Sequence, residues 1–288
     1  MAEMRRIIVP TDFSEASIHA IHFILDAFQH LKFELHLLNV YTPAPISGRF
    51  MSSTDAVDLL NPLMEEASSS NLYELQTHLL KSYESSRLSI VTHSSFGLLN
   101  HAMTDLIEEV SPHLILTSST KTSDLESFLL GNNTLSLIRN MEGIPLLVVP
   151  NQMKNATPKK IAVAVDLTRP ISTPSLKQVF SFREQLKSSI EFVHVSEEPS
   201  VDKYDLINGL SASGKDFYEQ YKDCLTIVPN EDSVTATLSR FLDKVSADVL
   251  VLFYHRNNLL YKLTHEPVVR RMLYKHEKAV YIIPEELD

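Results

Sequence analysis

The chain has 288 residues, enough for one large domain or two of ordinary size, and its 44% hydrophobic and 22% charged residues are typical of a globular protein. The formal net charge of -10 argues against general nucleic-acid binding, because a phosphate backbone would be repelled, and the single cysteine, Cys224, excludes an intrachain disulfide. Since no apolar run is long enough to span a bilayer or to form a signal-peptide core, we expect a cytoplasmic protein that does not enter a membrane.

The first half of the chain alternates short β-type runs with amphipathic stretches. Residues 6–12, RIIVPTD, predict a buried strand that stops near Pro10, and residues 13–30 predict a helix capped by Ser14. Four further strands are expected at 34–41, 88–94, 113–117 and 144–150. Helices are expected at 71–84, at 98–110 and after the polar loop 117–133. Alternation of this kind predicts an α/β fold with a parallel sheet covered by helices on both faces.

The second half of the chain repeats this plan. RRIIVPTDFS at the start of the chain matches KKIAVAVDLT after its middle. Asp12 and Asp166 are 154 positions apart, whereas Pro150 and Pro284 are 134 apart, so the second half lacks about twenty residues between its second and third strands. We predict two tandem domains, 1–150 and 160–288, joined by the polar linker 151–159.

Several short stretches, IIVPTDFSEAS at the start, HLLNVY at the second strand and LLG before the helix that leads to PLLVVP, resemble the universal stress protein family. The resemblance covers both halves, the first more clearly than the second. It implies two tandem nucleotide-binding-type (Rossmann-like) domains, each a five-stranded parallel sheet of strand order 3-2-1-4-5 flanked by helices. It also implies that the two domains pack through their fifth strands as an internal pseudo-dimer. Some members of this family bind ATP, and others have lost that ability.

Members of the family that bind ATP carry the motif Gly-x2-Gly-x9-Gly-Ser/Thr in the loop after the fourth strand. Laid on this chain, the motif keeps Gly131 as its third glycine, whereas Ser118 and Lys121 replace the first two. Asn132 takes the Ser/Thr place. The nucleotide site that the resemblance implies in the first domain comprises Asp12 and Val40 at the adenine end, their neighbours Pro10, Thr11 and Phe13, and the loop residues Ser118, Ser119, Lys121, Gly131 and Asn132.

The residue types in this loop leave two readings open. Glycines let backbone N–H groups approach a phosphate closely at a helix N-terminus. Ser118 adds a hydroxyl that can donate a hydrogen bond, and Lys121 adds a long side chain that either blocks the loop or supplies a cation. In the second half, Phe253 and Arg256 take the two glycine places, and Pro267 removes a backbone donor near the next helix start. No ATP is therefore expected there.

These observations favour a stress-response protein that binds or signals and has no catalytic residues, with an unidentified protein partner or further copies of itself as its partners. The alternative is a switch that binds ATP in the first domain and hydrolyses it slowly at most. A catalyst of adenylyl transfer is a third reading, but PTDFSEAS is not the Ser-Gly-Gly-x-Asp-Ser turn of that class. His19 and His22 lie three apart without further ligands nearby, so no metal site is predicted. His93 and His255 end predicted strands, at the edge where α/β folds bind ligands.

Overall fold

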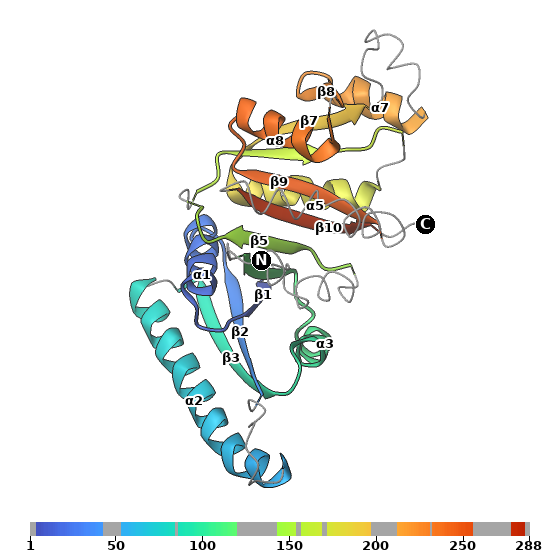
Figure 1. Ribbon diagram of the computed structural model, residues 1–288. Helices are drawn as coiled ribbons and strands as arrows, with labels where there is room; N and C mark the ends of the chain where they lie inside the picture. Colours follow the sequence, from blue (N-terminus) through green and yellow to red (C-terminus); the bar gives the residue numbers. More distant parts are fainter. Residues whose placement is uncertain are drawn as a thin grey trace.

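The computed structural model describes residues 4–42, 53–83, 86–119, 143–153, 157–168, 172–196, 212–230, 232–255 and 278–285. Its strands form one ten-stranded sheet of order β3-β2-β1-β4-β5-β10-β9-β6-β7-β8 (Figure 1). The strands are β1 (Arg5–Pro10), β2 (Phe33–Tyr41), β3 (Leu88–Phe96), β4 (Leu114–Ser119), β5 (Leu146–Pro150), β6 (Lys160–Ala164), β7 (Ser189–Ser196), β8 (Leu225–Pro229), β9 (Val249–His255) and β10 (Ala279–Glu285).

The sheet consists of two parallel halves joined back to back. In the first half β1 pairs in parallel with β2 and β4, β2 with β3, and β4 with β5; in the second half β6, β7, β8, β9 and β10 repeat these pairings. The halves meet where β5 and β10 pair antiparallel, with Val148 opposite Val280. The expected α/β fold, the strand order 3-2-1-4-5 and the meeting of the fifth strands are confirmed. The limits 1–150, 151–159 and 160–288 stay a prediction.

Helices cover both faces of the sheet, as Figure 1 shows. Their bounds are α1 (Glu15–Ala27), α2 (Ser53–Ser82), α3 (Leu99–Val110), α5 (Thr173–Leu186), α7 (Ala212–Tyr221) and α8 (Val234–Lys244). The predicted cap of α1 is confirmed, since the Ser14 side chain accepts a hydrogen bond from the Ser17 N–H group. Its apolar residues Ile18, Ile21, Leu25 and Phe28 recur at helical spacing and face the core: Ile18 is partly buried and the other three are fully buried.

Each face of the sheet carries its own hydrophobic core. One core packs α1, α2, α5 and α7 against the sheet, and it runs across the seam between β5 and β10. Phe182 of α5 stacks on Tyr281 of β10, with ring centroids 3.9 Å apart. The other core packs α3 and α8 through side chains such as Met103 and Phe241. Because both cores contain residues from both halves, we expect the halves to support each other.

The two halves differ most in the helix between their second and third strands. Helix α2 has 30 residues and α7 has 10, which places the shortened connection where the sequence predicts it. The expected start of the first of these helices near 71 is wrong, because α2 begins at Ser53 and contains Pro62. A proline and a serine-rich run resemble a polar loop in sequence, but an exposed helix tolerates them when its other end packs on the sheet.

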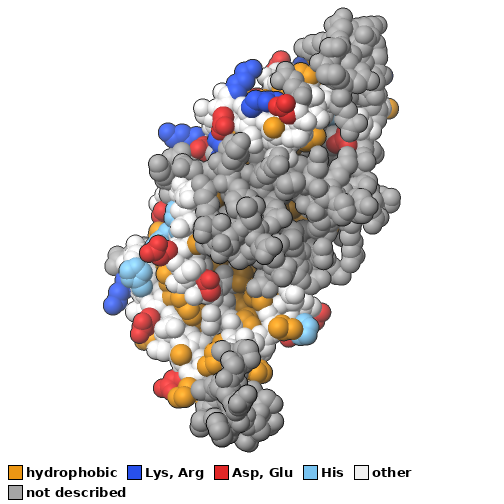
Figure 2. Space-filling model, in the orientation of Figure 1, with side chains coloured by type: hydrophobic (Ala, Val, Ile, Leu, Met, Phe, Trp, Pro, Cys, Tyr) orange, Lys and Arg blue, Asp and Glu red, His pale blue; other side chains and the backbone are white. Residues whose placement is uncertain are grey.

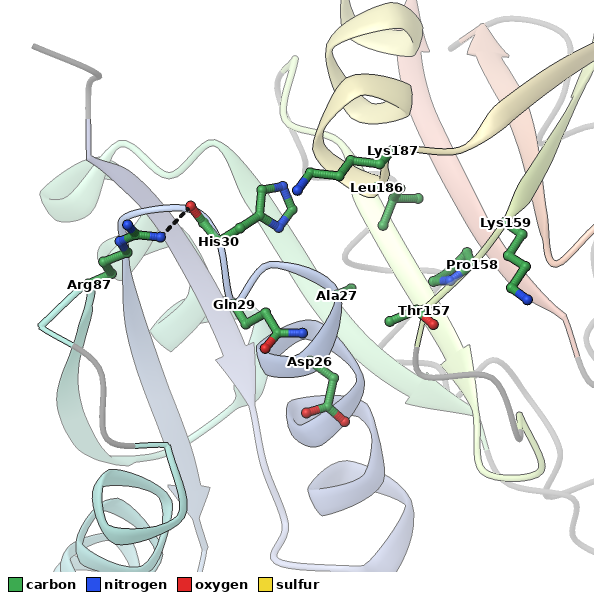
Figure 3. A pocket seen from close by; sticks show the side chains of 10 residues that line it. All are labelled: Asp26, Ala27, Gln29, His30, Arg87, Thr157, Pro158, Lys159, Leu186 and Lys187. Carbon is green, nitrogen blue, oxygen red and sulfur yellow. Dashed lines mark hydrogen bonds between the residues drawn. The ribbon is translucent and has the colours of Figure 1, made fainter.

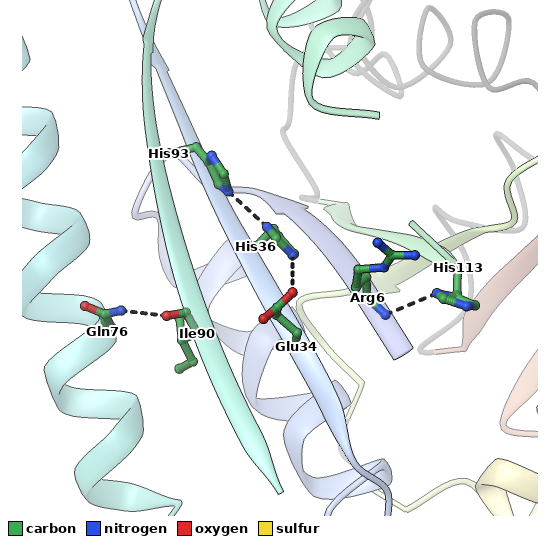
Figure 4. Close-up of polar contacts among 7 residues, drawn as sticks. All are labelled: Arg6, Glu34, His36, Gln76, Ile90, His93 and His113. Carbon is green, nitrogen blue, oxygen red and sulfur yellow. Dashed lines mark hydrogen bonds and ion pairs between the residues drawn. The ribbon is translucent and has the colours of Figure 1, made fainter. Parts of the chain in front are cut away.

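Helix α2 also protects the edge of the sheet. Its Gln76 side-chain amide donates a hydrogen bond to the backbone carbonyl of Ile90 in the edge strand β3 (Figure 4). An edge carbonyl left open would be a template for pairing with another chain. Hydrophobic side chains gather over this first half in the lower part of Figure 2. Among the described residues, Leu63, Tyr73, Phe96 and Leu98 are large hydrophobic side chains that stay exposed.

Candidate functional site

The turn after β1 is built by short hydrogen bonds from its own side chains. The Thr11 N–H group donates to the Leu38 carbonyl at 2.8 Å, which continues the β1–β2 ladder by one residue. The Thr11 hydroxyl then accepts from the Phe13 N–H group at 3.1 Å, and the Asp12 carboxylate accepts from the Ser14 N–H group at 3.0 Å. These contacts turn the chain sharply and place Ser14 at the start of α1.

Phe13 adopts an uncommon backbone conformation within this turn. Its φ angle is +61°, in the left-handed region that an aromatic residue rarely enters. The other non-glycine residues with positive φ in the described part of the chain, Ser111, Lys187 and Ser246, follow helix ends, where this conformation is usual. Phe13 instead precedes a helix and packs against the hydrophobic core. Strained residues held by their surroundings are frequent at ligand sites.

Asp12 presents an ionised carboxylate at this turn. Burial of the carboxyl raises its pKa, but hydrogen bonds from Ser14 outweigh this effect, and the pKa of Asp12 lies below its usual value. The side chain as a whole is exposed. A carboxylate in this position can accept hydrogen bonds from hydroxyl or amino groups of a ligand, and it repels an anion.

A chain of polar side chains supports the turn from behind. The Asn39 amide donates to the Thr11 carbonyl at 2.8 Å and accepts from the Ser68 hydroxyl of α2 at 2.7 Å. Ser68 in turn accepts from the Ser94 hydroxyl of β3 at 2.8 Å. Asn39 and Ser68 are 9% and 4% exposed, so these contacts replace lost contacts with water. The network ties β1, β2, β3 and α2 together beside the turn.

An open pocket of about 400 Å³ lies between this turn, the end of β2 and α2. Its volume is in the range of small-molecule sites. Its wall includes Asp12, Phe13, Asn39, Val40, Ser68 and Asn71, and within the described part of the wall Asp12 is the single charged side chain. The sequence analysis missed Asn39, Ser68 and Asn71. The signal for Asn39 was present, since a buried polar residue interrupts the apolar run LHLLNVY.

The predicted site residues fall into three groups in the structure. Pro10, Thr11, Asp12, Phe13 and Val40 come together at the carboxyl ends of β1 and β2. Ser118 and Ser119 end β4, which pairs with β1, so they lie at the same edge of the sheet. Ser119 is buried, and its carbonyl accepts from the Asn151 N–H group. The calls at Lys121, Gly131 and Asn132 lie outside the described residues.

The second half keeps the turn but changes its support. The Asp166 carboxylate accepts from the Thr168 N–H group at 3.0 Å and from its hydroxyl at 2.6 Å, as Asp12 does from Ser14. The Val165 N–H group bonds to the Val193 carbonyl, so the following residue, His194, occupies the place of Asn39. His194 Nδ1 lies 3.1 Å from the Val165 carbonyl oxygen, and this side chain is 6% exposed.

Histidines of the first half form an ordered pair away from the pocket (Figure 4). His36 Nε2 lies 3.0 Å from the Glu34 carboxylate, and its Nδ1 lies 3.0 Å from His93 Nε2. The carboxylate accepts from the Nε2–H group of His36, so while both rings are neutral His93 donates to His36. His93 does not end its strand, because β3 continues to Phe96. Burial and the neighbouring His36 lower the pKa of His93, and Glu109 opposes them.

The described part of the chain contains neither a metal-binding cluster nor a membrane-spanning helix. There, no group of three or more histidine, cysteine, aspartate or glutamate side chains is arranged to hold a metal ion. Among the same residues, every helix is too short or too polar to cross a membrane.

A doubled five-stranded parallel sheet with a pocket at the carboxyl ends of its first two strands defines an α/β protein of nucleotide-binding type. A profile of the universal stress protein family matches residues 3–150. The chain belongs to this family. A search of curated proteins found no match.

Solved structures of two-domain length share the fold. A universal stress protein from Archaeoglobus fulgidus DSM 4304 is 14% identical, with a TM-score of 0.66 over 97% of this chain and 96% of that chain. A protein described as a universal stress protein from Pseudomonas aeruginosa UCBPP-PA14 is 18% identical, with a TM-score of 0.60 over 98% and 93%. The cytoplasmic domain of a prokaryotic cation chloride cotransporter is 11% identical, with a TM-score of 0.50 over 97% and 95%. At these low sequence identities, the similarity to the three structures shows a shared fold alone.

Proposed function

We propose that this chain is a cytoplasmic stress-response protein that acts by binding and signalling and not by catalysis. Its first half keeps the nucleoside end of a nucleotide site, whereas its phosphate end is degraded. The observation that carries this proposal is the pocket beside Asp12, where the one charged side chain among the described lining residues is a carboxylate. Such a pocket suits a ribose hydroxyl or an adenine amino group and disfavours a triphosphate.

The residues around the pocket also argue against catalysis. Among the described residues that line the pocket, none is a histidine, lysine, arginine or cysteine, so these residues offer no such side chain as a general base or a nucleophile. Hydrogen bonds from Ser14 lower the pKa of Asp12 and position its carboxylate, which suits it for accepting hydrogen bonds from a ligand. We infer that the chain responds to an occupied pocket through α2, because Ser68 of α2 is bonded to the same Asn39 that supports the turn.

A second candidate is the ATP-binding switch in the first half, with slow hydrolysis at most. It is favoured by the pairing of β1 with β4, which brings Ser118 and Ser119 to the same sheet edge as Asp12. A ligand seated at Asp12 could extend toward the end of β4, where a hydroxyl at Ser118 and an ammonium at Lys121 would replace two glycines. The second half, with His194 in place of Asn39, is not proposed to bind ATP.

The partner of this protein would be another protein or further copies of the chain. The net charge of -10 disfavours nucleic acid as a partner.

Calorimetric titration of protein freed of bound nucleotide tests these proposals. Adenosine and ATP binding with similar affinity supports a pocket that recognises the nucleoside alone. ATP binding at least about a hundredfold more tightly than adenosine would support the switch, because the phosphates would then contribute. Asp12→Ala should abolish binding, and Asp166→Ala, its matched control in the second half, should not. If neither adenosine nor ATP gives heat of binding at millimolar concentration, the nucleoside proposal is wrong.

A further inference from the structure

A larger cavity lies on the seam between the two halves, away from the Asp12 pocket. Its volume is about 580 Å³ (Figure 3). Two helix ends, the segment before β6 and the residue before β3 form its wall. The residues that matter for its chemistry are Ala27, His30, Arg87, Pro158, Leu186 and Lys187. Because both halves contribute to this wall, a ligand in the cavity would touch both of them.

The cavity exists because α1 and α5 both stop beside it. Helix α1 ends at Ala27, and the Phe28 N–H group bonds to the Ile24 carbonyl. Helix α5 ends at Leu186, and Lys187 turns the chain away with a φ of +53°. The Lys187 N–H group donates to the Glu184 carbonyl at 3.2 Å. Backbone N–H groups thus bond to carbonyls at both helix ends. Because the Lys187 ammonium is not needed to cap α5, it is available for another partner.

Positive charge is concentrated around this cavity. Arg87 donates to the His30 carbonyl at 3.1 Å, and in Figure 3 the Lys187 ammonium points toward the His30 ring from the other side. Lys159 adds a third cation to the wall. Within the described ranges, neither Lys159 nor Lys187 forms an ion pair. Such a cluster of cations is notable on a chain whose net charge is -10.

Among the described residues of the wall, Asp26 carries the one carboxylate, and this group has a partner outside the cavity. Asp26 accepts a hydrogen bond from the Tyr83 hydroxyl at 2.9 Å, and Tyr83 also contacts His22 on the α1–α2 side. The field of the cations reaches His30: burial lowers the pKa of this ring, and Lys187 and Arg87 lower it further against the carbonyl of Gln185. Lys187 and Arg87 therefore both act on the ring of His30, which lies in the cavity wall.

The floor of the cavity is apolar. Ala27 and Leu186 are 7% and 8% exposed, and Pro158 is buried between them and the seam. An apolar floor with a few charged groups at its rim is the usual composition of a small-molecule site, and the volume fits that class. An inorganic ion alone would make no apolar contact with this floor.

We propose that this seam cavity binds a small organic anion, a phosphate or carboxylate carried on a compact apolar body, between the two halves of the sheet. Lys187 would hold the anionic group by a charge-assisted hydrogen bond, and Ala27 and Leu186 would contact the apolar body. Occupation would fix the helix ends of the two halves relative to each other. The proposal is independent of any ligand at Asp12.

Phenyl phosphate is a suitable probe, because it combines a phosphate with a compact apolar ring. In a ¹H–¹⁵N NMR titration of the full chain at constant ionic strength, we expect saturable shifts at the amides of His30, Thr157 and Lys187. Lys187→Gln should weaken binding about tenfold, the loss of one charge-assisted contact. The matched control Lys177→Gln removes an exposed lysine from the same helix, outside the cavity wall, and should not weaken it.

Three results would overturn the proposal. These are no saturable shift up to about 20 mM probe, an equal loss of affinity in both lysine variants, or shifts confined to the Asp12 turn. Sulfate tests the apolar floor separately. If sulfate binds as tightly as phenyl phosphate, the floor contributes nothing and the inferred organic body is wrong; weaker sulfate binding supports it.

Discussion

The turns after β1 and after β6 follow the same backbone plan but are supported by different side chains. In both, an aspartate accepts a hydrogen bond from the N–H group two residues later. Behind the first turn, Asn39 links the Thr11 carbonyl to Ser68 of the long helix α2. Behind the second, His194 takes that position. A duplicated fold can thus keep the backbone of a turn while a different side chain supports it in each copy.

The largest expected effect tests whether the two halves form one folding unit. Phe182→Ala removes a fully buried ring that stacks on Tyr281, and it should lower the free energy of unfolding by about 3–5 kcal/mol. Because the core crosses the β5–β10 seam, urea unfolding should remain a single transition by circular dichroism and by tyrosine fluorescence. Two separated transitions would show that the halves unfold independently.

The next effect concerns the network of the first half. Asn39→Leu leaves the buried Thr11 carbonyl and the Ser68 hydroxyl without this partner, so we expect a loss of about 2 kcal/mol in urea denaturation. Asn39→His introduces the residue type that the second half uses, and it should recover part of the loss. If the leucine variant is as stable as the parent chain, the network does not support the turn.

The two helix caps provide a matched pair of smaller size. Ser14 caps α1 and Ser172 caps α5, each by accepting from the N–H group three residues later. Ser14→Ala and Ser172→Ala should each cost about 1 kcal/mol of stability. Only the first should also weaken ligand binding at the Asp12 pocket, because the Ser14 side chain also bonds to that carboxylate and helps to fix its position. Equal effects of both variants on binding would contradict the assignment of the pocket to the first half.

The smallest expected effect is a pH dependence of the free energy of unfolding that arises from His93 in the first half. The pKa of His93 lies below its ordinary value of 6.5, so the unfolded chain takes up a proton at a higher pH than the folded chain. The contribution of this group to stability is therefore complete above pH 6.5 and is lost as the pH falls from there through the folded pKa.

His93→Gln should flatten this acid-side loss when the free energy of unfolding is compared at about pH 7.5 and about pH 5.5. His101→Gln, at an exposed position of α3, is the control and should leave the slope unchanged. An unchanged slope in His93→Gln would assign the acid sensitivity to other groups.

The sequence predicted the parts of this molecule that depend on local pattern. The strand β1, the Ser14 cap and the buried stripe of α1 follow from apolar periodicity and capping chemistry. The start of α2 could not be predicted in this way, because Pro62 and the serine-rich run resemble a loop in sequence. The helix is instead stabilised by the packing of Leu72, Leu75 and Leu79. Tertiary contact overrides local preference there.

The candidate site shows the same division. Asp12 and Val40 could be named because the family resemblance fixes their places next to strand ends. Asn39 stands out as a polar residue in an apolar run, but its role and that of Ser68 arise from a contact between a strand and a helix, 29 residues apart in the chain. The cavity between the two halves could not be predicted either, since its wall joins residues from both halves that no local pattern relates.

The central claim, that the first half alone keeps the nucleoside end of the site, is tested most directly by titrating adenosine into three proteins: the parent chain, Asp12→Ala and Asp166→Ala. The account predicts saturable heat for the parent chain and for Asp166→Ala, and none for Asp12→Ala. Binding that survives Asp12→Ala, or that is lost in Asp166→Ala, would contradict it.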